Sequence, residues 1–242
     1  MDDGGSDAVV LPARFNGPPG SANGGFTCGV VVRLLDATAA EVTLRSPPPL
    51  DTPLRVERDA DAVKVLDDDQ LVAEANRVPG VDVEVPEPVA LPGAHEASAR
   101  YPWYEEHPFP TCFVCGPRRP DRDGLSIFAG RVAGREVYAC DWTPASEWDR
   151  GDGLLRDEIV WAALDCPSAV AAAAGPGTGP GPAVLARLAA SIDDAPAVGE
   201  QHTVISWPIG IDGRKRHAGS AILDSAGRVR AHARALWIEL RG

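Results

Sequence analysis

One order of predicted elements occurs twice along the 242-residue chain, and this repetition constrains the fold more than any other feature of the sequence. In each half, an apolar helical segment precedes a run of strand-like segments separated by turn residues. The helices are predicted at residues 26–35 and 155–174. A helix that is apolar nearly all round must be wrapped by other structure. The sequence therefore predicts an α+β fold made of two helix-on-sheet units.

The strands are marked by turn residues, and the two halves contain matching hairpins. Residues 62–75 and 220–233 each read as strand, Asp-containing turn and strand. Strands are predicted at residues 8–11, 41–45, 54–60, 62–66, 71–78, 124–132, 136–142, 183–192, 202–211, 216–224 and 229–239. The alternative is an unrelated α+β fold in which the similarity of the halves is accidental.

Two segments interrupt this order. Residues 86–110 are rich in Pro, Glu and His and lack periodicity, which predicts a linker. The expected organisation is a first unit at 1–85, the linker at 86–110 and a second unit at 111–242. Residues 175–182, rich in Gly and Pro, predict a loop.

Charge and hydropathy exclude several classes of protein. The formal net charge of −12 disfavours nucleic-acid binding, which needs a clustered basic excess. The sequence has no apolar run long enough to span a membrane, and its start does not resemble a secretory signal. We therefore expect a cytoplasmic protein that binds neither nucleic acid nor membrane.

The five cysteines do not form a recognisable framework. Their number is odd and only Cys112 and Cys115 are close in sequence, so we expect reduced thiols. A structural zinc site normally has four ligands, and beyond this pair only His107 is near. We expect a packing or turn role for the pair, with no bound metal and no cofactor.

Motifs in the second half carry a resemblance to a known family. Residues 112–117 read CFVCGP and are followed by Gly124 and Leu125. This order resembles the "CFGCGP, then NPxGL" entry of PaaI-like thioesterases, in the acyl-CoA thioesterase superfamily. The chain departs from that pattern at 119–123, where Arg-Pro-Asp-Arg-Asp stands in place of the usual Asn-Pro.

The helices extend the resemblance to both halves. Residues 142–144 and 158–165 are similar to the family's strand end and to its helix, in which His-Gly-Gly is followed further along by Asp. In the first half, Asn23, Gly24 and Gly25 occupy the place of the family's His-Gly-Gly. The resemblance implies a double hotdog fold, in which a curved antiparallel sheet wraps a long central helix in each of two paired units.

The resemblance also implies hydrolysis of an acyl-CoA or related acyl thioester. This chemistry needs donors for the developing oxyanion and a carboxylate that directs water or attacks the carbonyl. By the family pattern, Gly24 and Gly25 at a helix start hold the carbonyl, with Asn23 beside them, and Asp165 is the base or nucleophile.

Each half keeps only one part of this machinery. Nine residues after Asn23 lies Val32, whereas nine residues after Arg156 lies Asp165. The second helix start has no glycine pair. The resemblance therefore implies one composite site between the halves and one inactive counterpart. The alternative for Asp165 is a structural carboxylate bonded to nearby backbone.

Four further residues are secondary candidates. Glu158 is a second catalytic candidate because it lies roughly two helical turns before Asp165, although a first-turn acid is also favourable in a purely structural role. Arg214, Lys215 and Arg216 form a basic run that could bind the phosphates of coenzyme A. The alternative for this run is a solvated turn.

Two other functions remain open at this stage. One is a non-catalytic hotdog protein that binds an acyl or CoA ligand, and the other is an acyl thioester hydratase or dehydratase. The hydratase chemistry would need a positioned Asp/His pair, for which the sequence offers no clear partner. The expected partner is a small acyl thioester, and a homodimer is compatible with the fold.

Overall fold

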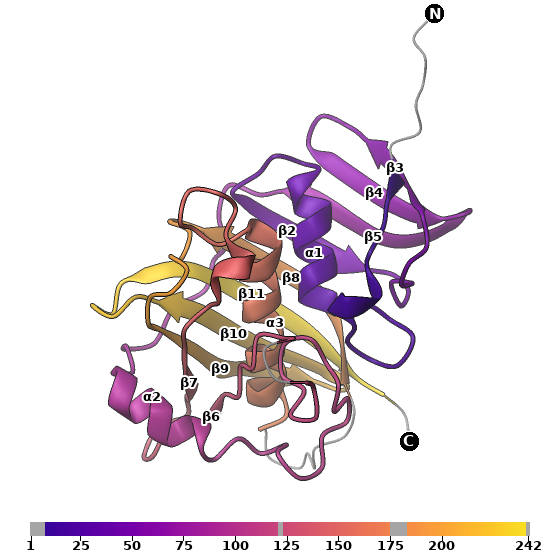
Figure 1. The fold of residues 1–242 in the computed structure, drawn as a ribbon. Helices are drawn as coiled ribbons and strands as arrows, with labels where there is room; N and C mark the ends of the chain where they lie inside the picture. Colours follow the sequence, from indigo (N-terminus) through magenta and orange to yellow (C-terminus); the bar gives the residue numbers. More distant parts are fainter. Residues whose placement is uncertain (1–7, 121–122, 175–182, 241–242) are drawn as a thin grey trace, which may run out of the picture.

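The structure is a computed structural model that describes residues 8–120, 123–174 and 183–240. The loop predicted at 175–182 lies outside the described residues. Within them, the strands form one 11-stranded antiparallel sheet in the order β1-β3-β4-β5-β2-β8-β11-β10-β9-β7-β6 (Figure 1). The strands are β1 Ala8–Val9, β2 Ala39–Leu44, β3 Leu54–Arg58, β4 Ala62–Asp67, β5 Gln70–Arg77, β6 Gly130–Arg131, β7 Tyr138–Trp142, β8 Ala183–Ile192, β9 His202–Asp212, β10 Lys215–Leu223 and β11 Val229–Glu239.

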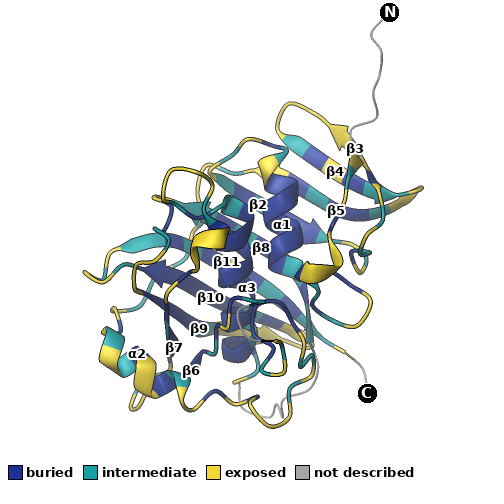
Figure 2. Cartoon of the chain, viewed as in Figure 1, coloured by how far each residue is buried: buried dark blue, intermediate teal, exposed yellow. Residues whose placement is uncertain are grey.

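Two helices lie side by side against one face of this sheet. The α-helices of the described residues are α1 Gly24–Arg33, α2 Leu91–Ser98 and α3 Asp157–Ala172, and short 3-10 turns lie at Ala13–Phe15 and Ser146–Trp148. Of these, α1 and α3 are the adjacent pair (Figure 1), and Figure 2 shows that both are buried over most of their length. Both helices are therefore apolar because other structure covers them, as the sequence predicts.

Glycines allow α1 and α3 to pack closely. A Cβ at Gly25 would lie 2.4 Å from the Cβ of Asp165, and a Cβ at Gly29 would lie 2.4 Å from the Cα of Glu158. Real Cβ atoms do not approach neighbours this closely, so only glycine fits at either position at this helix separation. The contact fixes which residues of α3 face the start of α1.

The two halves of the chain share the sheet through one strand pair. Strand β2 from the first half pairs antiparallel with β8 from the second, with Ala40 opposite Ala190 and Val42 opposite Leu188. These four side chains are buried on the helix side of the sheet. The core is consequently continuous from one half to the other.

The segment predicted as a linker contains a helix. Helix α2 packs against β7, and its residues Ala94 and Ala97 are buried. Pro92 lies at the helix start, where its missing N–H costs nothing because first-turn N–H groups have no intrahelical acceptor. The prolines of this segment therefore coexist with regular structure.

The strand predicted at 124–132 is shorter than expected, because only Gly130–Arg131 pairs with β7. The residues before it fold back on the first half. The N–H of Phe113 donates to the carbonyl of Asn16, and the Phe113 ring packs edge-on against Phe15. Contacts thus cross the predicted unit boundary at 111.

In the described part of the chain, no helix is both long and apolar enough to cross a membrane.

Candidate active site

The side chain of Asp165 on α3 points to the start of α1. Its Oδ2 accepts a hydrogen bond from the backbone N–H of Gly25 at 2.9 Å and another from Nδ2 of Asn23 at 2.9 Å. The carboxylate and its two donors come from different halves of the chain. The structure therefore brings together Asn23, Gly25 and Asp165, with the N–H of Gly25 bonded to the carboxylate.

The local sequence explains why both donors are available. Asn23 is the N-cap of α1, and its Oδ1 accepts from the N–H of Phe26, which leaves Nδ2 free to donate to Asp165. The N–H of Gly25 lies in the first turn, where a helix offers no internal acceptor. The N-cap residue and the first turn together form a two-donor pocket for one carboxylate oxygen.

The α3 backbone around Asp165 is braced by hydroxyl groups. Pro167 lies inside this helix and removes one N–H from its hydrogen-bond ladder. The Oγ of Ser168 donates to the carbonyl of Asp165 at 2.6 Å, and the Oγ of Ser220 on β10 donates to the carbonyl of Leu164 at 2.6 Å. These bonds hold the turn that carries the carboxylate.

Burial dominates the electrostatics of Asp165. The residue is 1% exposed, and this burial raises its pKa to about 7, because removal from water disfavours the charged form. The hydrogen bonds from Gly25 and Asn23 act in the opposite direction. Among the described residues, the second oxygen, Oδ1, has no hydrogen-bond partner. One carboxylate oxygen is thus fixed and the other is free.

A cavity of about 340 Å³ borders this carboxylate. It lies between the halves, with walls from the α1 start, α3, β2, β8 and β11. Its apolar lining includes Leu44, Trp103, Phe109, Ala169, Leu185 and Trp237. A volume of this size accommodates a small acyl group.

Gly24 contributes a further donor to the cavity. It is the first residue of α1 and lines the cavity beside Asp165. Within the described part of the chain, its backbone N–H has no hydrogen-bond partner. The helix start therefore carries an unused donor, with the partial positive charge of a helix N-terminus, next to the carboxylate.

Glu158 lies away from the cavity. It is buried at the opposite end of the helix pair, where its Oε1 lies 3.3 Å from a guanidinium nitrogen of Arg33 and 3.7 Å from one of Arg156. It does not line the cavity that Asp165 borders. The structure thus gives Glu158 the alternative role, that of a charge-paired acid in the first turn of α3.

Only one member of the basic run reaches the cavity. Arg216 is buried and lines it, but both its Nε and a terminal nitrogen contact Oε1 of Glu239, at 2.9 Å and 2.6 Å. Arg214 instead donates to the carbonyl of Glu239, and Lys215 pairs with Asp212 at 3.7 Å. The cationic group of Arg216 is therefore already neutralised by a carboxylate.

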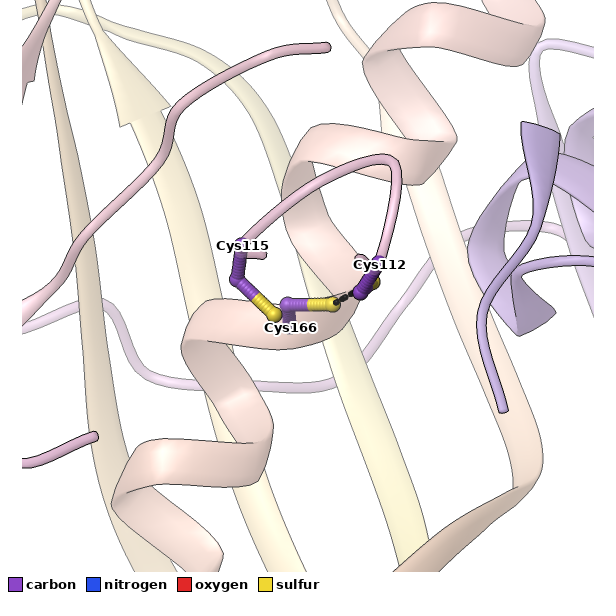
Figure 3. A group of neighbouring side chains, drawn as sticks. All are labelled: Cys112, Cys115 and Cys166. Atoms are coloured by element: carbon purple, nitrogen blue, oxygen red, sulfur yellow. Dashed lines mark hydrogen bonds between the residues drawn. The ribbon is translucent and has the colours of Figure 1, made fainter. Parts of the chain in front are cut away.

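The cysteine pair has a third neighbour. Cys112 and Cys115 lie on a loop that crosses α3 beside Cys166 (Figure 3), and all three line the same cavity as Asp165. Hydrogen bonds from Cys115 and Cys166 hold the pKa of Cys112 well below its ordinary value. The spacing of the pair is visible in the sequence, whereas Cys166 comes close only through the packing of the loop on α3.

Comparison with known proteins adds evidence on the fold. No family model matches the sequence, and no curated protein matches it. Among solved structures, a tesB protein from Mycobacterium avium subs paratuberculosis has a TM-score of 0.61 at 13% identity, over 96% of this chain and 91% of that chain. A candidate thioesterase from Novosphingobium aromaticivorans gives 0.62 at 15% identity, over 97% and 95%.

A third match is a protein of unknown function with a hot dog fold from Alicyclobacillus acidocaldarius, with a TM-score of 0.56 at 10% identity, over 100% of this chain and 96% of that one. At such identities the likeness establishes the fold alone. The chain has a hotdog-like α+β fold, and its resemblance to the thioesterase superfamily is confirmed at that level.

Proposed function

We propose that this chain is a thioesterase made of two hotdog units, which hydrolyses an acyl-CoA or related acyl thioester at the composite site between them. One observation carries the proposal. A carboxylate on the helix of the second half is held by the helix start of the first half, at the wall of an apolar cavity. The pairing of β2 with β8 in one sheet also supports the proposal, because it brings α1 and α3 side by side.

In this proposal, the two oxygens of Asp165 have separate tasks. Oδ2 is anchored by Gly25 and Asn23, so the orientation of the carboxylate is fixed before substrate enters. Oδ1, which has no partner among the described residues, accepts a proton from water or attacks the thioester carbonyl carbon. Burial in an apolar wall makes a carboxylate a stronger base and a stronger nucleophile, because little water solvates its charge.

We assign the N–H of Gly24 as the hydrogen-bond donor to the carbonyl oxygen of the substrate. From the sequence, both glycines were expected to bind the carbonyl, but the N–H of Gly25 is already bonded to Asp165. The N–H of Gly24 has no such partner within the described residues, and Gly24 is one of the residues that line the cavity. A donor at a helix start stabilises the negative charge that develops on the oxygen during attack.

The rival function is binding without hydrolysis, and the same hydrogen bonds favour it. A carboxylate that accepts two hydrogen bonds is stabilised in place, as expected of a structural link between the helices. In this case the apolar cavity would hold an acyl group and Asp165 would only join α1 to α3.

The experiment is a panel of acyl-CoA thioesters of increasing chain length, with release of free CoA followed by chromatography. Chromatography is preferable to a thiol reagent because the protein itself has five cysteines. We expect hydrolysis of at least one thioester well above the rate without protein. If no thioester is hydrolysed while several raise the melting temperature, the chain is a binding protein and the proposal is wrong.

A further inference from the structure

The loop at 112–116 and helix α3 bring three thiols to one point. The Sγ atoms of Cys112, Cys115 and Cys166 all lie within 4.8 Å of one another, and those of Cys112 and Cys166 are 3.7 Å apart (Figure 3). All three residues are buried, and none forms a disulfide. From the sequence, we expected no metal at Cys112 and Cys115 because too few further ligands were near. Cys166 supplies a third thiol that the sequence did not place beside them.

We propose that Cys112, Cys115 and Cys166 together bind one thiophilic divalent cation of the zinc type. Three thiolates are a sufficient protein ligand set when water or a ligand atom occupies the fourth position. Tetrahedral zinc with Zn–S bonds of about 2.3 Å places its sulfurs about 3.8 Å apart. The 3.7 Å between Cys112 and Cys166 matches this spacing.

A tight turn fixes the position of Cys112. Gly116 closes the turn by donating to the carbonyl of Cys112, and a Cβ at this glycine would lie 2.5 Å from the Cys112 nitrogen.

Side chains around the cluster donate to the other sulfurs. Nδ2 of Asn23 lies 3.7 Å from the sulfur of Cys166, and Nε2 of His107 lies 3.3 Å from the sulfur of Cys115. The N–H of Phe109 donates to Nδ1 of His107, so the proton of the neutral ring is on Nε2. That proton faces the hydroxyl oxygen of Tyr101 at 3.0 Å as well as the sulfur of Cys115, so His107 is assigned as a donor and not as the fourth ligand. N–H donors to sulfur partly offset the charge of bound thiolates, as outer hydrogen bonds do around metal ligands generally.

Binding displaces one proton from each thiol to solvent and gives a complex of net charge −1 from the dication and three thiolates. The fourth position is left to water or to an atom of a ligand in the cavity, which all three cysteines line. The proposal concerns metal binding only, and it stands whether or not the chain hydrolyses thioesters.

The test begins with the wild-type chain, purified without metal-chelating resin and analysed for metal content. We expect about one zinc per chain, or uptake of about one Co²⁺ per chain into protein freed of metal, with intense sulfur-to-cobalt charge-transfer absorption. X-ray absorption at the zinc edge should show about three sulfur ligands at about 2.3 Å. A site with two or fewer sulfurs would overturn the proposal even if zinc is present.

A matched pair of variants locates the site. Cys166→Ser should abolish the charge-transfer absorption and weaken Co²⁺ binding by about 10² or more. Cys140→Ser is the control, because Cys140 is also buried and free but lies on β7 outside the cluster. Equal metal content in the two variants would contradict the site.

Two further results would also overturn the proposal. One is wild-type protein that takes up no Co²⁺ at micromolar concentrations under reducing conditions. The other is an intact mass that shows a Cys112–Cys166 disulfide as the native state. If Cys166→Ser fails to fold, the sulfur count of the wild-type X-ray absorption spectrum still decides the question.

Discussion

The two ends of the α1–α3 pair are related in sequence but differ in what they hold. At one end, the start of α1 offers Asn23 and Gly25 to the carboxylate of Asp165, beside a cavity. At the other end, the start of α3 has Glu158 paired with Arg33 and Arg156, and Glu158 does not line that cavity. The contact between α1 and α3 thus holds Asp165 without a cationic partner at one end and Glu158 paired with arginines at the other.

The difference shows two ways in which this fold stabilises a buried carboxylate. Both acids are buried, so burial alone does not distinguish them. Asp165 is bound by neutral donors that leave Oδ1 without a partner among the described residues, whereas Glu158 is compensated by guanidinium groups. The predictions below test this contrast, starting from the largest expected effect.

Removal of the charge at Asp165 should have the largest effect on catalysis. Asp165→Asn keeps the shape and the acceptor for Gly25 but removes the base, so the rate of thioester hydrolysis should fall by about 10² or more. The melting temperature should change little. Thioesterase activity close to that of the wild type in this variant would remove Asp165 from the mechanism.

Gly25→Ala should separate the helices at the end that holds Asp165. The new Cβ would lie 2.4 Å from the Cβ of Asp165 and 2.6 Å from the Trp161 carbonyl, so α1 must shift. We expect a loss of about 1–3 kcal/mol in the free energy of unfolding. A displacement of the donors by about 1 Å should lower the rate by up to about 10².

The control for this variant is Gly80→Ala, where a Cβ meets no atom within 4 Å and should leave both stability and rate unchanged. Equal denaturation midpoints in urea for the two variants would mean that the helix contact is looser than the structure has it.

Asn23→Ser separates the two tasks of Asn23. Serine still caps α1 by accepting from the N–H of Phe26, but it is too short to donate to Asp165. Loss of one hydrogen bond to a charged group should lower the rate about tenfold. Asn23→Ala should give a similar rate and, in addition, lose about 1 kcal/mol of stability with the cap. Stopped-flow rates and urea denaturation together distinguish the two effects.

Glu158→Gln should have the smallest effect on activity. Glutamine keeps an acceptor for Arg33 and Arg156, and the site lies outside the cavity. The rate should change by less than about threefold, with a stability change within about 1 kcal/mol. A fall of the same size as in Asp165→Asn would show that both ends of the helix pair take part in the reaction.

The sequence predicts the strands best where their pattern is set by local residues. The predicted ranges 183–192 and 229–239 coincide with β8 and β11, and in β11 alternate residues are buried from Ala231 to Trp237. Helix α2 escaped prediction because its proline and glycine mask a short helix, although Ala94 and Ala97 have the spacing of one buried face. The helix depends on burial against β7, which is a tertiary contact.

The candidate site was predictable only in part for the same reason. The family resemblance selected Asp165 through its spacing from the helix start, and it placed Asn23, Gly24 and Gly25 at the start of the first helix. The sequence could not reveal that Glu239 neutralises Arg216, or that Cys166 joins Cys112. Both are long-range contacts, and no local pattern specifies the partner of a charged or thiol side chain.

The pairing of β2 with β8 has a consequence for how activity depends on dilution. The donors and the carboxylate of the site lie on different halves of the chain. If the halves were separate molecules, they would dissociate on dilution below their dissociation constant, and the site would be lost. In one chain, the tether and the shared sheet make this assembly intramolecular. Turnover per molecule should therefore be the same in the most dilute assay as at cellular abundance.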